Sequence, residues 1–174
     1  MPSRFVKSYL WRSCVFERQP LGLDGNSITD WSKLKLLTKL KELSLRGCCD
    51  VLADFIKNLS PEAEKSLVRL NLSHNTLRPE DLSTLLLKVS HLHALDISET
   101  NTTSIYGISN LRRLRFLDMS RNPMEHLDPS NLPPLLQSLD LSYTSINEQS
   151  MRTLSVALKE GRLGTRGNLP PVRR

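Results

Sequence analysis

The sequence predicts an α/β solenoid: about six short repeats stacked side by side, with a parallel concave sheet and a convex side of mixed helices and 3₁₀ turns. The first observation behind this prediction is composition, because aromatic residues make up only 5% of the chain and leucine carries most of its apolar content. The second is a pattern of leucines that returns at intervals of 22 to 27 residues. Self-similarity of this period is typical of chains built from stacked supersecondary units.

Each copy of the pattern starts at an apolar residue, carries two more apolar residues three and five positions later, and has Asn, Cys or Thr eight positions after the start. Complete copies start at Leu40, Leu67, Leu92, Leu114 and Leu136, and a degenerate copy starts at Arg18. Alternate side chains of a strand point to opposite faces, so the second and third apolar residues define one buried face. A single repeat has nothing to bury that face against, and neighbouring repeats must therefore stack.

Five copies in one register resemble the leucine-rich-repeat family, and the resemblance covers residues 18–158. It implies a unit made of a strand followed by a helix or a tighter turn. It also implies that Asn75 and Asn122, which follow their strands, bond the buried backbone where the chain turns inward. Cys48, Thr100 and Thr144 occupy the same place but can make fewer hydrogen bonds, so we expect looser turns there.

The convex segments differ in length, and the two longer repeats carry signals for helix starts. Pro61 and Pro79 are each followed by acidic residues, a combination favoured at a helix N-terminus. The 22-residue repeats leave room only for a short turn or a 3₁₀ segment. Residues 153–158 are expected to belong to a last helix that covers the open end of the stack.

Three segments follow from these patterns: a basic N-terminal segment over 1–17, the repeat domain over 18–160, and a basic tail over 161–174. The first segment has no acidic residue before Glu17, a composition typical of mitochondrial transit peptides, but its aromatic residues also suit a cap helix on the first repeat. The tail is rich in glycine, proline and arginine and is not expected to pack. We expect a mitochondrial location, with a cytoplasmic or nuclear one as the alternative.

The formal charge of +6 belongs to the two ends of the chain. Residues 21–158 hold 15 basic and 16 acidic side chains, which leaves a net charge of −1. A solenoid that binds nucleic acid along its face is expected to carry positive charge on its body, so this balance weighs against such binding. The odd number of cysteines (Cys14, Cys48 and Cys49) favours a reducing compartment, and no apolar run is long enough to span a membrane.

Outward-facing residues of the predicted strands are the first candidates for a binding surface. Asp96, Asp118 and Asp140 occupy equivalent places in consecutive repeats, and strands about 4.8 Å apart would stack them into an acidic row. Such a row suits a basic helix or an arginine-rich peptide, although solvated aspartate is common at this place in the family. The other candidates are Arg46, His74, Arg121 and Tyr143 beyond the strand ends, and Arg162, Arg166, Arg173 and Arg174 in the tail.

Catalysis is not indicated by any pattern in the sequence. The four histidines have no acidic or cysteine partner at a metal-ligand spacing, and there is no nucleotide-binding or nucleophile motif. We therefore expect a non-catalytic protein-interaction scaffold with no cofactor, no metal site and no small-molecule substrate.

The leading interpretation is a structural or assembly subunit that contacts protein subunits of a larger, mitochondrial complex. One alternative is an RNA-linked module of a ribonucleoprotein such as a mitochondrial ribosome, with RNA contacts through the basic termini. Another is a regulatory adaptor for a phosphatase or a ubiquitin ligase. Concave residues vary independently of the fold, so the repeat pattern leaves all three open.

Overall fold

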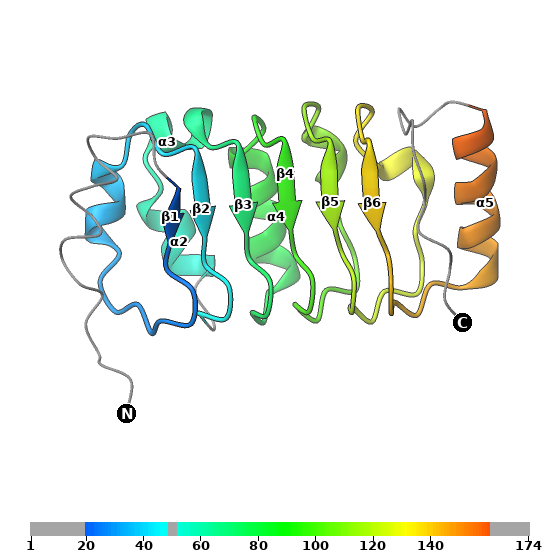
Figure 1. The fold of residues 1–174 in the computed structure, drawn as a ribbon, viewed down its shortest axis with the longest axis horizontal. Helices are drawn as coiled ribbons and strands as arrows, with labels where there is room; N and C mark the ends of the chain where they lie inside the picture. Colours follow the sequence, from blue (N-terminus) through cyan, green and yellow to red (C-terminus); the bar gives the residue numbers. More distant parts are fainter. Residues whose placement is uncertain (1–19, 49–51, 161–174) are drawn as a thin grey trace.

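A computed structural model describes residues 20–48 and 52–160 of the chain. Six short strands form one parallel sheet, and their order in space follows their order in the sequence (Figure 1). The strands are β1 (Leu21–Gly22), β2 (Glu42–Ser44), β3 (Arg69–Asn71), β4 (Ala94–Asp96), β5 (Phe116–Asp118) and β6 (Ser138–Asp140). This arrangement confirms the predicted α/β solenoid with its parallel sheet.

The strand register follows from the leucine pattern. The central residues Leu43, Leu70, Leu95, Leu117 and Leu139 pair with one another from strand to strand. Each of them is at most 4% exposed. Burial of a leucine side chain contributes roughly 1.5 to 3 kcal/mol, and this contribution is available only because the next repeat supplies the covering surface.

Helices and 3₁₀ turns cover the convex side of the sheet, and the core lies between the two layers (Figure 1). The convex elements are η1 (Ser32–Leu36), α2 (Leu52–Asn58), α3 (Pro61–Ser66), α4 (Pro79–Lys88), η2 (Ile108–Asn110), η3 (Pro129–Asn131) and α5 (Glu148–Lys159). Apolar residues of both layers form one continuous buried cluster that runs from the first repeat into α5.

Repeat length decides which convex element forms. The 22-residue repeats hold only the 3₁₀ turns η1, η2 and η3, as expected, whereas the longer repeats hold α-helices. Pro61 and Pro79 begin α3 and α4, in agreement with the helix-start signals. Helix α2 was not predicted, although its buried residues Leu52, Phe55 and Ile56 have helical spacing.

Asparagine side chains join neighbouring repeats inside the solenoid. The Asn122 Nδ2 group donates to three carbonyl oxygens, those of Ile97 (2.8 Å), Met119 (2.9 Å) and Ser120 (3.2 Å). Its Oδ1 atom accepts the backbone N–H groups of Thr100 (3.1 Å) and Thr102 (2.9 Å) from the preceding repeat. The expected loose turn at Thr100 is therefore wrong, because Asn122 of the next repeat closes that turn.

Helix α5 closes the C-terminal end of the solenoid. Its N-cap residue Asn147 accepts the N–H of Ser150 (2.9 Å), and its inner face buries Ser150, Leu154 and Ala157. This helix includes the predicted segment 153–158 but begins five residues earlier. The N-terminal segment 1–17, for which a cap helix or a targeting sequence was predicted, lies outside the described residues.

Candidate functional site

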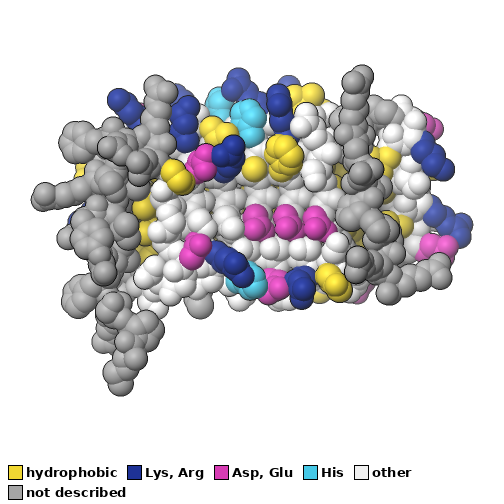
Figure 2. Space-filling model, viewed as in Figure 1, with side chains coloured by type: hydrophobic (Ala, Val, Ile, Leu, Met, Phe, Trp, Pro, Cys, Tyr) yellow, Lys and Arg dark blue, Asp and Glu magenta, His cyan; other side chains and the backbone are white. Residues whose placement is uncertain are grey.

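The concave face of the sheet is hollowed into an open groove of about 540 Å³ that is lined by residues of all six strands. Figure 2 shows this face, with three acidic side chains next to one another near its centre. They are Asp96, Asp118 and Asp140, the last residues of β4, β5 and β6, which pair in register. The row predicted from the repeat alignment is thus present as geometry, while its role in binding stays a prediction.

Each carboxylate of this row uses one oxygen to stabilise its own turn. The Oδ1 atoms accept the N–H groups of the serines two residues later, at 3.0 Å for Asp96, 2.9 Å for Asp118 and 2.8 Å for Asp140. Among the described residues, these three side chains form no ion pair and none of their Oδ2 atoms has a hydrogen-bond partner. The Oδ2 atoms therefore remain available to a donor placed in the groove.

A second row lies at the edge where the strands end, and its members bind one another. The Arg46 Nη2 group lies 2.9 Å from His74 Nε2, and His74 Nδ1 lies 2.7 Å from Glu99 Oε2. Arg121 Nε lies 3.3 Å from Glu99 Oε1, and the Arg121 guanidinium stands 4.7 Å from the centre of the Tyr143 ring. Both His74 contacts are satisfied at once by a neutral ring with its proton on Nδ1.

This edge row combines four of the predicted binding residues with Glu99, which was not among them. All but Arg46 adopt the left-handed backbone conformation, with φ between 52° and 58°. A non-glycine residue in this conformation costs about 1 to 3 kcal/mol and persists only where the surrounding structure holds it. Here the turns of the stacked repeats hold these residues in place. The ion pair between Arg121 and Glu99 is half-exposed, so it adds at most about 1 kcal/mol. Since these charges already have partners, the row is a weaker candidate for binding than the aspartates.

Comparison with known proteins supports the repeat assignment. A family model described as Leucine Rich Repeat matches residues 113–135, which contain β5 and the turn that follows it. The other strands of the sheet repeat the same geometry. The chain has the leucine-rich-repeat fold.

A solved structure resembles this chain at the level of the fold. The crystal structure of an internalin from Listeria monocytogenes matches with a TM-score of 0.50 and 16% identity, over 84% of this chain and 54% of that chain. This chain therefore spans about half the length of the internalin. The structure of a TLR13–ssRNA13 complex matches with a TM-score of 0.37 and 20% identity, over 66% of this chain and 24% of that one. No curated protein sequence matches.

Sequence reasoning missed one prominent residue of this leucine-rich-repeat face, Phe116. Its side chain is 51% exposed and lines the groove on the same strand as Asp118. The neighbouring strands place the small residues Ala94 and Ser138 beside it, so the ring stands clear of its neighbours. Aligning the outward residues that precede the central leucines would have found it, because it is the only aromatic residue in that column.

Other predicted features of the chain are not brought to the groove. The tail residues Arg162, Arg166, Arg173 and Arg174 lie outside the described part of the chain. Within residues 20–48 and 52–160, no group of three His, Cys, Asp or Glu side chains is arranged to hold a metal ion. The same residues contain no helix long and apolar enough to cross a membrane.

Proposed function

We propose that this chain is a non-catalytic protein-binding module whose concave groove holds a basic segment of a partner protein. The observation that carries the proposal is the set of three aligned carboxylates in a groove that also exposes Phe116, and among residues 20–48 and 52–160 none of their Oδ2 atoms has a hydrogen-bond partner. Lysine or arginine side chains of a partner would make charge-assisted hydrogen bonds to the carboxylates. An apolar or guanidinium group beside them would pack on the Phe116 ring.

The wider setting that we propose is a structural or assembly role in a larger complex, located in the mitochondrion. The self-paired edge row and the open groove across all six strands together form a long surface, which suits a protein partner better than a small molecule. An RNA-linked ribonucleoprotein module and a regulatory adaptor for a phosphatase or ubiquitin ligase remain the alternatives. Co-purification separates the three, because it identifies complex subunits, nuclease-sensitive partners or a single regulatory enzyme.

The triple variant Asp96→Asn, Asp118→Asn, Asp140→Asn tests the groove. The fold should survive, because Asn71 already occupies this position in β3 and accepts the same bonds from Ser73 N (2.9 Å) and Oγ (2.7 Å). Loss of three half-exposed charges at about 1 kcal/mol each corresponds to roughly 100-fold weaker binding. The measurement is quantitative mass spectrometry of proteins that co-purify with tagged wild type and variant, followed by titration of the purified partner.

A matched control removes three carboxylates that lie away from the groove, in the variant Glu62→Gln, Glu80→Gln, Glu125→Gln. It should keep the partners of the wild type, and ribonuclease treatment should not release them. Partners that remain bound to the aspartate variant would contradict the groove proposal. Partners lost only after ribonuclease treatment would replace it with the ribonucleoprotein alternative.

The mitochondrial location has a separate test. Residues 1–25 fused to a fluorescent reporter are expected to send it to mitochondria, because Arg4, Lys7 and Arg12 precede the first acidic residue. The variant with these three residues changed to glutamine should leave the reporter diffuse. A diffuse signal from the unmodified fusion would overturn the targeting proposal and leave the cap-helix interpretation.

A further inference from the structure

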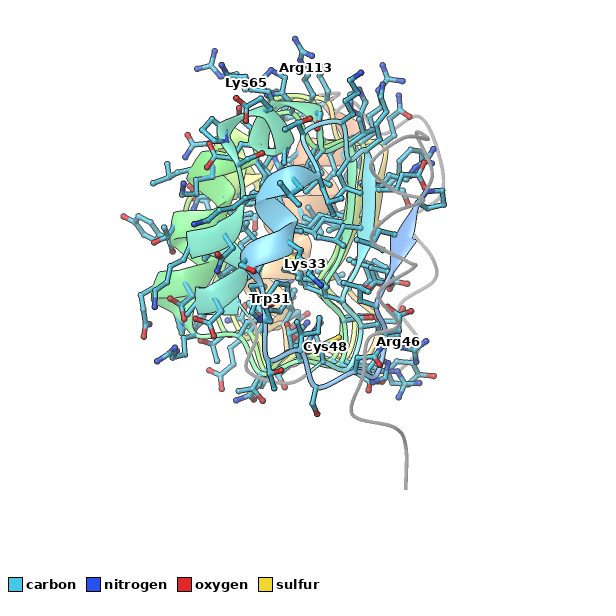
Figure 3. The ribbon with its side chains drawn as sticks, turned by 90° about the vertical axis from the view of Figure 1, so that its left-hand side faces the viewer. Trp31, Lys33, Arg46, Cys48, Lys65 and Arg113 are labelled. Atoms are coloured by element: carbon cyan, nitrogen blue, oxygen red, sulfur yellow. The ribbon has the colours of Figure 1, made fainter. Side chains whose placement is uncertain are left out.

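One edge of the sheet gathers cationic side chains over a stretch of four successive repeats. We call this set the basic rim; it consists of Lys39, Lys41, Lys65, Arg112, Arg113 and Arg115, all of which are exposed. Lys41 and Arg115 directly precede β2 and β5, so the rim lies where the strands begin. Figure 2 shows basic side chains along this edge, and Figure 3 places Lys65 and Arg113 at the edge opposite Arg46.

Backbone hydrogen bonds hold the rim in line. The Lys41 carbonyl accepts the N–H of Val68 (2.7 Å), the Val68 carbonyl accepts that of His93 (2.8 Å), and the His93 carbonyl accepts that of Arg115 (2.9 Å). The strand ladder thus continues one residue beyond the strands. From β2 to β5 the rim spans three strand spacings, or about 14 Å.

The rim charges have no ion-pair partners within the described residues. Two nearby acidic side chains are already engaged, Glu42 with Arg69 and Glu64 with Lys88 (2.6 Å), whereas Glu62 of α3 has no ion pair with any residue that the structure describes. The net charge of −1 over residues 21–158 therefore conceals a separation of charge. Cations collect along one edge, and the three aspartates stand further along the strands in the groove.

Aromatic rings lie among these cations. Phe116 follows Arg115 and is half-exposed. His91 and His93 precede β4 between the lysine and arginine parts of the rim, and His93 Nδ1 lies 3.1 Å from the His91 carbonyl oxygen, which fixes the orientation of its ring. A row of cations interleaved with rings is the arrangement that binds single-stranded nucleic acid, because the cations neutralise phosphates and the rings stack on bases.

We propose that the basic rim binds single-stranded nucleic acid, with phosphates on its lysine and arginine side chains and bases stacked on Phe116 and His93. An acidic protein segment would use the cations but would have no use for the rings, so the rings favour nucleic acid. The aspartate row repels phosphate and keeps the strand at the edge. The inference does not rest on the proposed function, since it uses other charges than the groove aspartates and shares only Phe116 with the groove.

The test is the variant Lys41→Gln, Arg113→Gln, Arg115→Gln in the full chain. Fluorescence anisotropy with labelled 12-nucleotide RNA and DNA single strands of one mixed sequence measures the affinity at several salt concentrations. We expect at least tenfold weaker binding by the variant. The slope of log affinity against log salt should also become shallower by about 2, because each lost phosphate contact removes about 0.7. The strand that binds more tightly, RNA or DNA, identifies the natural ligand class.

A matched control removes three cations that lie off the rim, in the variant Lys33→Gln, Lys35→Gln, Lys159→Gln, and should bind within twofold of the wild type. Both variants keep the basic termini, so a contribution from the termini cancels. Phe116→Leu should weaken binding about fivefold or more without changing the salt slope, because it removes stacking but no charge. Equal losses in the rim and control variants would overturn the proposal. So would displacement of the strand by polyglutamate with no effect of Phe116→Leu, which indicates an acidic protein partner.

Discussion

Replacing Asn122 by alanine should lower the free energy of unfolding by about 3 to 5 kcal/mol, because the change leaves several buried groups unpaired at about 1 to 3 kcal/mol each. Asn122 is 2% exposed. Its side chain donates to three carbonyl oxygens and accepts two backbone N–H groups, and the partners Ile97, Thr100 and Thr102 belong to the preceding repeat. Equilibrium unfolding in urea, followed by circular dichroism, measures the loss.

Thr144→Ala is the matched control at the same place in the last repeat. The Thr144 side chain is half-buried and donates one hydrogen bond, to the Leu141 carbonyl of its own repeat (2.7 Å). Its loss should cost only about 1 kcal/mol. Similar losses for the two variants would mean that the contacts of Asn122 with the neighbouring repeat contribute nothing, and would contradict the role of Asn122 as the joint between repeats.

Leu154→Ala should destabilise the protein by about 2 to 5 kcal/mol through the cavity that it leaves in the buried cluster. Leu154 is 1% exposed and is the central inner residue of α5, which covers the last repeat. In a solenoid each repeat contacts only its neighbours, so loss of a terminal cap should loosen the nearest repeat first. Hydrogen exchange should therefore accelerate at β6 and η3 before it does at β3 and β4.

Val156→Ala provides the comparison on the same helix. Val156 is 52% exposed on the outer side of α5, and a surface change of this kind should cost less than about 0.5 kcal/mol. Uniform loss of protection over β2 to β6 in the Leu154 variant would argue against a local capping role. It would show instead that the six repeats unfold as one unit.

The two proposed surfaces share Phe116 but use different charged residues, so substitutions of those charges separate them. The groove presents the carboxylates of Asp96, Asp118 and Asp140, whereas the rim presents cations before the strands. Phe116 lies between the two surfaces, on the strand that joins Arg115 to Asp118. A protein that held a basic protein segment in the groove and a nucleic acid strand on the rim would join the two kinds of molecule side by side.

The repeat pattern predicted most of the fold because leucine-rich repeats make their important contacts locally. Spacing within each copy is enough to place Leu70, Leu95 and Leu117 in register, and the prolines mark the starts of α3 and α4. Helix α2 was not predicted because the proline and acidic residues of its repeat mark only the start of α3, whereas 27 residues accommodate two short helices. The acidic row was also predicted from the spacing of the repeats, since equivalent positions of adjacent repeats must stack.

Pairing between repeats could not be predicted in the same way. Glu99 binds both His74 and Arg121, which lie 25 and 22 residues away in the chain. Which cation such a carboxylate selects depends on side-chain reach across two strands, and single-repeat patterns do not contain that information. The same holds for the turn at Thr100, which looked weakly bonded in its own repeat and is closed by Asn122 of the next one.

The sequence by itself determined the repeat, the strand register, the buried leucine face and the alignment of Asp96, Asp118 and Asp140, because these depend on periodicity alone. Only the tertiary structure decided how charge is distributed in space. The body of the chain is nearly neutral by count, yet ion pairs such as Glu64 with Lys88 engage acidic side chains near the rim, and the rim cations have no ion-pair partner among the described residues. Electrostatic partners are chosen by distance across neighbouring repeats, and distance across repeats is a property of the fold.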